Sequence, residues 1–262
     1  MTIFLSHLRQ TYDKNEASNT EKNRWDLYNY RSHLNKRFYC TRTFKNYKIQ
    51  LKNNTLNGNK MDHKQIFQNA LEAERANPND LQNKFGLACL LLYGIGTDKN
   101  EKKAFDIYTE LSAKNNVSGI EALANMYIQG QYVNVDVKKA EEIIQDKLIK
   151  INSGKSLNSA GSLYYTLSFK VGGNQSIVYS HKAFELFNKA LELGCEEANY
   201  YLGEYYLFGR NTCLIDENKA YLYFKKAALV GHDEAIARVK EMENTQKFKQ
   251  GLGVVRLLSG LF

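Results

Sequence analysis

The sequence predicts an all-α fold, an α-solenoid of helical hairpins, and three observations support this. The chain of 262 residues contains a single proline, Pro78, and proline is the residue that most strongly breaks helices. Apolar residues recur at the i, i+3, i+4 and i+7 spacing of one helix face. A Lys-Ala pair also recurs, beginning at Lys103, Lys139, Lys182 and Lys219. Steps of 36, 43 and 37 residues between these pairs are typical of a repeat of paired helices.

Residues 1–60 form a basic N-terminal arm. The arm holds 12 Lys and Arg residues against 4 Asp and Glu residues, whereas residues 61–262 hold 24 of each kind. The net charge of +8 therefore belongs to the arm, and bulk charge gives the rest of the chain no reason to bind nucleic acid or an anionic membrane. The stretch 27–60 contains no acidic residue, a composition typical of a mitochondrial transit peptide.

A short motif in the arm indicates where such a peptide would be removed. Arg37-Phe38-Tyr39-Cys40 resembles the matrix-processing pattern, with an arginine three residues before the cut and an aromatic residue just before it. We therefore expect a transit peptide over about residues 1–39 and a mitochondrial location, with a cytoplasmic location as the alternative. Two other interpretations stay open: aromatic residues among the cations of 27–60 could stack on RNA bases, or the arm could be a solvated tail.

Residues 61–80 are expected to form a helix that caps the array at its N-terminal end. Ile66, Phe67, Ala70 and Leu71 share one face of this helix, and Pro78 cannot continue it. A repeat array needs such a cap because its terminal unit has a neighbour on one side only.

Each repeat is predicted to be a helix, a tight loop and a second helix. The second helix starts at the Lys-Ala pair and carries the apolar stripe. The first helix places small residues beside large ones, since glycine or alanine lets two helices approach closely. Glycines that can end the first helix in the left-handed conformation are Gly94, Gly130 and Gly209. Polar residues that can cap the second helix are Asn100, Asp136 and Asp216.

These residues resemble the Sel-one-like repeat, a tetratricopeptide-related helical hairpin. The fourth unit matches best, through Leu202-Gly203, Tyr206, Gly209, Asp216, Lys219-Ala220, Lys225-Lys226-Ala227-Ala228 and Gly231. The resemblance covers four repeats over about residues 81–240 and implies a right-handed α-solenoid. It also implies binding of other proteins, because members of the family organise membrane complexes and one mitochondrial branch assists respiratory-chain assembly. That branch is rich in cysteine, and this chain is not.

Two places depart from the pattern. The third unit has a longer stretch, 168–180, between its helices, so we expect a protruding loop that is either neutral length variation or a contact site. The second unit departs in its last turn. Beyond the repeats, residues 241–262 end in an apolar run, which we expect to be a C-terminal cap; a docking peptide or a membrane-surface segment is the alternative. The residues expected to seal the last hairpin are Val254, Val255, Leu258 and Leu261.

No catalytic or metal-binding motif was found, so we expect a protein that is not an enzyme and has no cofactor. Gly154-Lys155-Ser156 resembles the end of a phosphate-binding loop, but Ile149 stands where that loop needs glycine. The five histidines are scattered singly, and no apolar run approaches the roughly 20 residues of a membrane span. The cysteines are expected to be small buried thiols in a reducing compartment; they are Cys40, Cys89, Cys195 and Cys213.

An array of helical hairpins presents an extended surface, which favours a scaffold that binds other proteins. Combined with the arm, it leads us to expect a factor in the assembly or biogenesis of a mitochondrial complex; the alternative is an RNA-associated gene-expression factor that uses residues 27–60. We expect the partner to meet the first helices. The candidates are Asn125, Gln129, Glu204 and Leu207, with Tyr205 as the best interface anchor. The alternative for Tyr205 is packing between helices.

Overall fold

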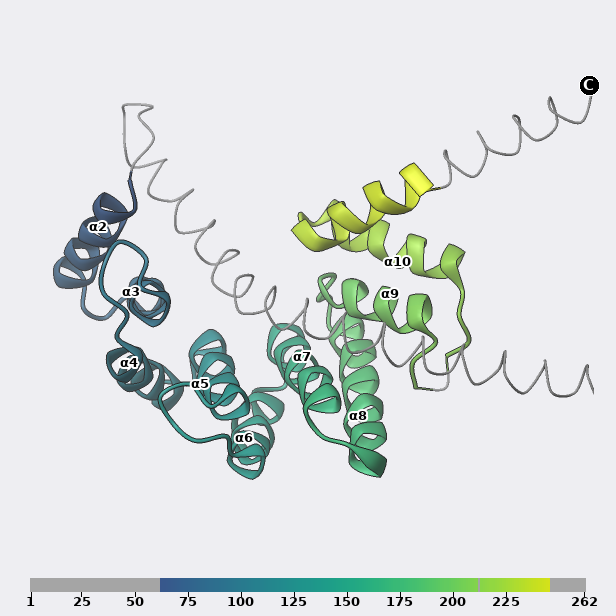
Figure 1. Cartoon of the computed structure of the whole chain (residues 1–262), viewed down its shortest axis with the longest axis horizontal. Helices are drawn as coiled ribbons and strands as arrows, with labels where there is room; N and C mark the ends of the chain where they lie inside the picture. The colour runs from purple at the N-terminus through teal and green to yellow at the C-terminus, as the bar shows by residue number, and fades with distance from the viewer. Residues whose placement is uncertain (1–61, 212, 246–262) are drawn as a thin grey trace, which may run out of the picture. The chain divides into compact units, whose positions relative to one another are not determined.

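A computed structural model describes residues 62–211 and 213–245, and its regular elements are all helices (Figure 1). They are α2 (His63–Ala76), α3 (Leu81–Tyr93), α4 (Glu101–Ala113), α5 (Val117–Gln129), α6 (Val137–Ile143), the π-helix η1 (Ile144–Ile149), α7 (Gly154–Lys170), α8 (Gly173–Glu192), α9 (Ala198–Phe208) and α10 (Glu217–Leu229). A last helical stretch covers residues 233–245. No strand occurs in these ranges, so the predicted all-α, helical-repeat solenoid class is confirmed.

Several predictions fall outside the described residues. These are the basic arm, the processing motif Arg37–Cys40, and the sealing residues between Val254 and Leu261. The structure therefore leaves the transit peptide and the C-terminal cap as predictions.

The chain divides into two compact units, and the boundary between Ala104 and Phe105 falls inside α4. In the first unit, α2 packs against α3. Ile66 and Ala70 form the buried face of α2, and every residue of 85–92 in α3 is buried. Asp62 starts α2 by accepting a hydrogen bond on Oδ1 from the backbone N of Gln65 at 2.8 Å.

The predicted ends of the helices are confirmed by the backbone. The glycines that end α3, α5 and α9 have φ values of 65°, 70° and 57°; they are Gly94, Gly130 and Gly209. The predicted caps accept hydrogen bonds from backbone N atoms three residues later, at 2.9, 2.8 and 2.8 Å; they are Asn100, Asp136 and Asp216. Since these signals act within a few residues, the repeat boundaries follow from local sequence.

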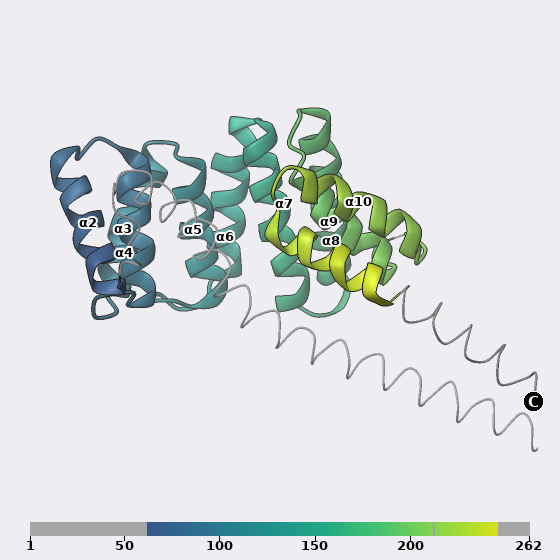
Figure 2. The same ribbon diagram turned by 90° about the horizontal axis from the view of Figure 1, so that it is seen from above.

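In the second unit, α5 packs on α6, α7 on α8, and α9 on α10, which makes three successive hairpins (Figure 2). Within two of them, a glycine on the first helix leaves room for an aromatic ring on the second. A Cβ built on Gly161 would lie 2.7 Å from the Phe187 ring, and one built on Gly203 would lie 2.7 Å from the Phe224 ring. The predicted close approach of the paired helices at Gly203 is therefore confirmed.

The prediction of a protruding loop over residues 168–180 is wrong. α7 continues through Lys170 and α8 begins at Gly173, so the extra residues lengthen the two helices to 17 and 20 residues. No proline interrupts this stretch, and Gly173, with a φ of 61°, makes the sharp turn between them. The Ser176 hydroxyl donates to the backbone O of Ser168 across that turn.

The irregular last turn of the second unit is the π-helix η1. The stripe position occupied by Ala190 in the third unit and Ala227 in the fourth holds Lys147 here. Its Nζ donates to the backbone O of Ser112 in the last turn of α4, at 3.1 Å. A lysine suits that place, because the last carbonyl groups of a helix lack partners within the helix.

Candidate protein-binding surface

Tyr205, the predicted interface anchor, is buried in the core with an exposed fraction of 0%. α9 places its ring 5.1 Å from the ring of Phe184 and 5.7 Å from that of Tyr165, measured between centroids. Its hydroxyl donates to the backbone O of Ser180 in α8 at 2.6 Å, and burial raises the pKa of Tyr205 above its ordinary value. The prediction that Tyr205 is an exposed interface anchor is therefore wrong. The alternative, that Tyr205 packs between helices, is confirmed.

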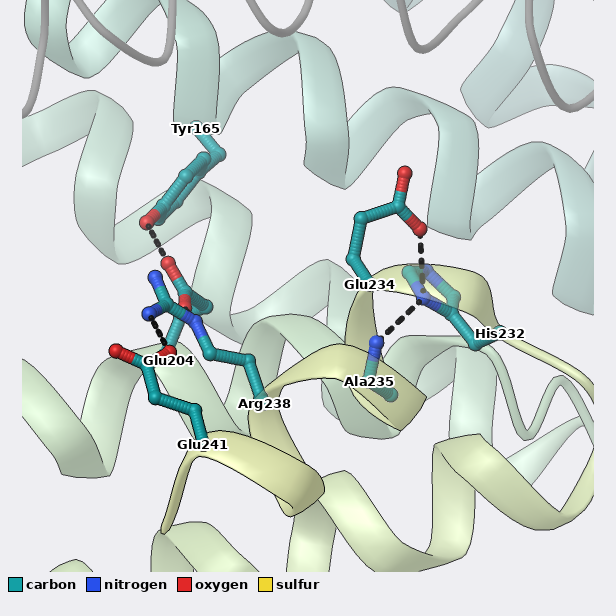
Figure 3. Close-up of polar contacts among 7 residues, drawn as sticks. All are labelled: Tyr165, Glu204, His232, Glu234, Ala235, Arg238 and Glu241. Carbon is teal, nitrogen blue, oxygen red and sulfur yellow. Dashed lines mark hydrogen bonds and ion pairs between the residues drawn. The ribbon is translucent and has the colours of Figure 1, made fainter. Parts of the chain in front are cut away.

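Glu204 is also buried, at 1% exposed, so its expected place on an open face is wrong (Figure 3). Its Oε1 lies 3.4 Å from Nε of Arg238, and its Oε2 accepts from the hydroxyl of Tyr165 at 3.4 Å. Arg238 belongs to the stretch 233–245 and also pairs with Glu241, with 2.9 Å between Nη1 and Oε2. The reason for the error is that this following helix covers the face of α9 that carries Glu204.

The remaining predicted residues, Asn125, Gln129 and Leu207, are half-buried. Leu207 packs against the buried cluster formed by Ala220, Phe224, Ala227 and Ala235. Asn125 and Gln129 lie on α5, where no described contact gives them a functional role. Their contact with a partner stays a prediction.

Polar side chains between neighbouring hairpins form hydrogen bonds with one another. On α5, Glu121 accepts from Oγ of Ser159 at 2.9 Å and from Oγ of Ser162 at 3.0 Å, both on α7. These hydrogen bonds and the one from Tyr165 to Glu204 link first helices of successive hairpins. They hold neighbouring repeats in register, because a buried carboxylate must keep its donors.

A second carboxylate, that of Glu141, links the second helix of one hairpin to the second helix of the next. Glu141 of α6 accepts from Nζ of Lys182 at 2.8 Å and from the hydroxyl of Tyr179 at 3.0 Å, both on α8. The hydroxyl of Tyr164 on α7 lies 3.5 Å from it. Burial by itself would raise the pKa of Glu141, but the hydrogen bonds from Lys182 and Tyr179 outweigh burial and lower it.

The N-terminal turn of the stretch 233–245 is organised by His232, which is buried and stacks on the Tyr200 ring at 4.4 Å between centroids. Its Nδ1 faces the backbone N of Ala235 at 3.4 Å and Oε2 of Glu234 at 3.0 Å (Figure 3). These contacts give the histidine a packing role at a helix start.

Metal centres and membrane-spanning helices were sought among the residues that the structure describes. Within 62–211 and 213–245, no three His, Cys, Asp or Glu side chains gather in a way that could hold a metal ion. The same ranges contain no helix that could cross a membrane. Ser156 of the phosphate-loop-like motif forms a capping box with Ser153 at the start of α7, so this motif has a structural role.

The predicted buried thiols are confirmed for two cysteines. Cys89 and Cys195 are buried, and Cys213 is half-buried. Burial, with the hydrogen bond to the Glu197 carboxylate, raises the pKa of Cys195 to about 12, so its thiolate form is scarce at neutral pH.

Among the described residues, six exposed large apolar side chains lie where the two helices of a hairpin connect, and four others lie elsewhere, at Leu193, Leu222, Leu229 and Val230. The α5–α6 connection exposes Tyr132 and Val135, the first turns of α8 expose Ile177 and Val178, and the α9–α10 connection exposes Leu214 and Ile215. In a tandem array, such connections lie at the same end of each hairpin. The sequence argument offered residues 168–180 as a possible contact site, and this stretch contains Ile177 and Val178. It did not single out the other two connections.

The α9–α10 connection also carries Arg210, which the sequence argument did not single out. Its guanidinium lies over three aromatic rings, those of Phe169, Tyr165 and Phe208. Only the chain's fold brings these rings together, because two of them come from α7 and one from α9.

The Sel1 repeat family matches residues 84–116, 118–143, 180–195 and 196–232. The chain belongs to the Sel1-repeat family. The third match covers only part of α8 and leaves out α7, which is the place where the helices of this Sel1-repeat protein are lengthened. Sel1 repeats are typical of helical scaffolds for protein interaction, and the family is generally non-catalytic. No curated protein matches the chain.

Two solved structures are similar to this Sel1-repeat protein at low identity. A Sel1 repeat protein from Oxalobacter formigenes is 22% identical, with 72% of this chain and 73% of that chain covered and a TM-score of 0.48. A protective antigen present in uropathogenic Escherichia coli strains, displaying an SLR fold, is 20% identical, with 69% of this chain and 37% of that chain covered and a TM-score of 0.45.

Proposed function

We propose that this Sel1-repeat protein is a non-catalytic scaffold that binds other proteins and assists the assembly of a mitochondrial complex. The observation that carries the binding role is the apolar surface at the hairpin connections, where Leu214 is 85% exposed and Ile215 70% exposed. Exposed apolar groups at neighbouring sites are typical of contact surfaces, whereas the charged groups between the hairpins already have partners within the chain.

The mitochondrial part of the proposal is supported by the amino-acid sequence of the arm. The stretch 27–60 has basic residues and no acidic ones, and Arg37-Phe38-Tyr39 is followed by a candidate cut.

A paired substitution tests the binding role. Proteins that bind the full chain are covalently cross-linked to it in isolated mitochondria. They are compared with the proteins cross-linked to a double variant that combines Leu214→Ser and Ile215→Ser. The control is Leu222→Ser with Leu229→Ser on α10, which removes apolar groups of comparable exposure, 59% and 82%, away from the connections. We expect the first pair to lose cross-linked partners and the control to keep them. Equal loss from both pairs, or no cross-linked protein at all, would contradict the proposal.

RNA association is the second candidate, favoured by the aromatic residues that alternate with cations in 27–60. It predicts that the full chain retains RNA in a salt-dependent way and that deletion of residues 1–60 abolishes this retention. Retention that survives the deletion, or none at low salt, excludes the arm as an RNA-binding segment.

A further inference from the structure

Arg210 follows the glycine that ends α9, and aromatic rings hold its side chain in place. Its Cζ lies 4.2 Å from the ring centroid of Phe169, 5.1 Å from that of Tyr165 and 5.4 Å from that of Phe208. Stacking on several rings fixes the plane of a guanidinium and removes water from one of its faces. The side chain is therefore pre-positioned before any ligand arrives.

The charge of Arg210 lacks a counter-ion within residues 62–211 and 213–245. Its Nε is buried without a hydrogen-bond acceptor, and no carboxylate there lies within ion-pair distance of the guanidinium. Arg238 provides the contrast, because both Glu204 and Glu241 pair with it (Figure 3). A partly desolvated cation without an anion is unfavourable, and ring contacts offset only part of that cost. An external anion would complete the site.

Two exposed isoleucines lie on the connection that carries Arg210 and on the adjoining helix α8. Ile215 lies close to the residue before Arg210, since its Cγ1 would be 2.8 Å from a Cβ built on Gly209. On α8, Ser180 and Phe184 contact Tyr205 of α9, and Ile177 lies one turn earlier on the same face. Ile177 is 66% exposed. Ile215 is therefore beside the start of the connection that carries Arg210, and Ile177 is on the face of α8 that packs on α9.

We propose that Arg210 binds a carboxylate side chain of a partner protein, in an extended segment whose neighbouring apolar residues pack on Ile177 and Ile215. The inference rests on the proposed scaffold function and names the chemistry that one of its contacts recognises. A single carboxylate fits better than phosphate or RNA, because Arg210 offers one positive charge, which balances a singly charged group but not a multiply charged anion. A guanidinium and a carboxylate also match in shape through two parallel hydrogen bonds.

The test uses the full chain and two C-terminally amidated peptides that carry an uncharged BODIPY fluorophore on the N-terminus, Leu-Ile-Asp-Leu-Ile and its uncharged counterpart Leu-Ile-Asn-Leu-Ile. Fluorescence anisotropy is expected to show at least about tenfold tighter binding of the aspartate peptide. Arg210→Gln should abolish this preference, and Arg210→Lys, which keeps the charge without the planar fork, should reduce it. Lys170→Gln removes an exposed positive charge beside Phe169 and should leave the preference unchanged. Circular dichroism melts establish that each variant is folded.

Each other outcome overturns the proposal. Equal binding of the two peptides by the full chain excludes carboxylate recognition, and an unchanged preference in Arg210→Gln excludes Arg210. Inorganic phosphate or a short RNA could also displace the labelled aspartate peptide. If either did so at a lower concentration than the unlabelled aspartate peptide, the site would be assigned to phosphate. None of these results affects the cross-linking comparison at Leu214 and Ile215, so failure of the scaffold function would be seen separately.

Discussion

At Gly203, the absence of a side chain sets the distance between the two helices of the fourth repeat. A Cβ there would lie 2.7 Å from the Phe224 ring, closer than real Cβ contacts, and Phe224 is fully buried. We expect Gly203→Ala to lower the free energy of unfolding by about 1–3 kcal/mol, and Gly203→Leu by more, because the ring has little space to move. Thermal melting by circular dichroism measures both.

Gly172→Ala is the matched control for this substitution. A Cβ at Gly172 would have no other atom within 4 Å, and its backbone conformation suits any residue. Because Gly172 is the N-cap residue of α8, where glycine is preferred to alanine, Gly172→Ala should cost at most about 1 kcal/mol, through the helix start alone. A melting midpoint of Gly203→Ala equal to that of this control would mean that the two helices are not packed as described.

Tyr205 contributes through both its ring and its hydroxyl. Tyr205→Phe removes the hydrogen bond that the hydroxyl donates to the backbone O of Ser180 and the longer one that it accepts from Oγ of Ser180, and it should cost about 0.5–1.5 kcal/mol. Tyr205→Ala leaves a cavity among Phe184, Tyr165 and Phe187 and should cost about 3–5 kcal/mol. Urea unfolding measures both values. If Tyr205→Phe lost partner binding while its unfolding curve stayed unchanged, Tyr205 would belong to the binding surface after all.

At the scale of elements, Glu141 links α6 to α7 and α8, and its ionisation makes that link dependent on pH. Its pKa is lowered in the folded protein from the ordinary value of 4.5. The carboxylate therefore stabilises the fold above about pH 4.5, and this contribution is lost as the pH falls through the lowered pKa. We expect Glu141→Gln to be less stable than the natural protein at pH 7 and to lose less stability on acidification.

Glu142→Gln is the control, because Glu142 is an exposed neighbour whose carboxylate pairs with Lys139 on the same helix turn. Unfolding free energies from pH 3 to pH 7 should have the same slope for this control as for the natural protein. If Glu141→Gln also kept the natural slope, the three-helix link would contribute nothing to stability.

At the scale of the whole molecule, the basic arm and the repeats are expected to act in sequence, first delivering the chain and then binding its partner. We predict that the chain enters mitochondria and loses about 39 residues, whereas a version starting at Met61 stays in the cytosol. Mass spectrometry of the mature N-terminus, together with cell fractionation, measures this. An endogenous protein that keeps Met1 or Thr2 and fractionates with cytosol would contradict the mitochondrial proposal.

The helices, their ends and the repeat could be predicted because the signals are local. Asp136 caps α6 and Gly130 ends α5 through contacts a few residues away, and the apolar stripe follows from helix geometry alone. The same kind of reasoning failed over 168–180, where repeat spacing predicted a loop. The chain there contains no helix breaker before Gly172, so both helices simply continue.

The candidate site could not be predicted in the same way, because burial depends on residues far along the chain. Glu204 and Tyr205 lie on the first helix as expected, but the stretch 233–245 and α8 cover them. Arg210 stands in a connection that the sequence assigns only to a turn. Its unpaired charge and its rings from two helices exist only once α7 and α9 are packed together, since ring stacking and loss of water are properties of the tertiary structure.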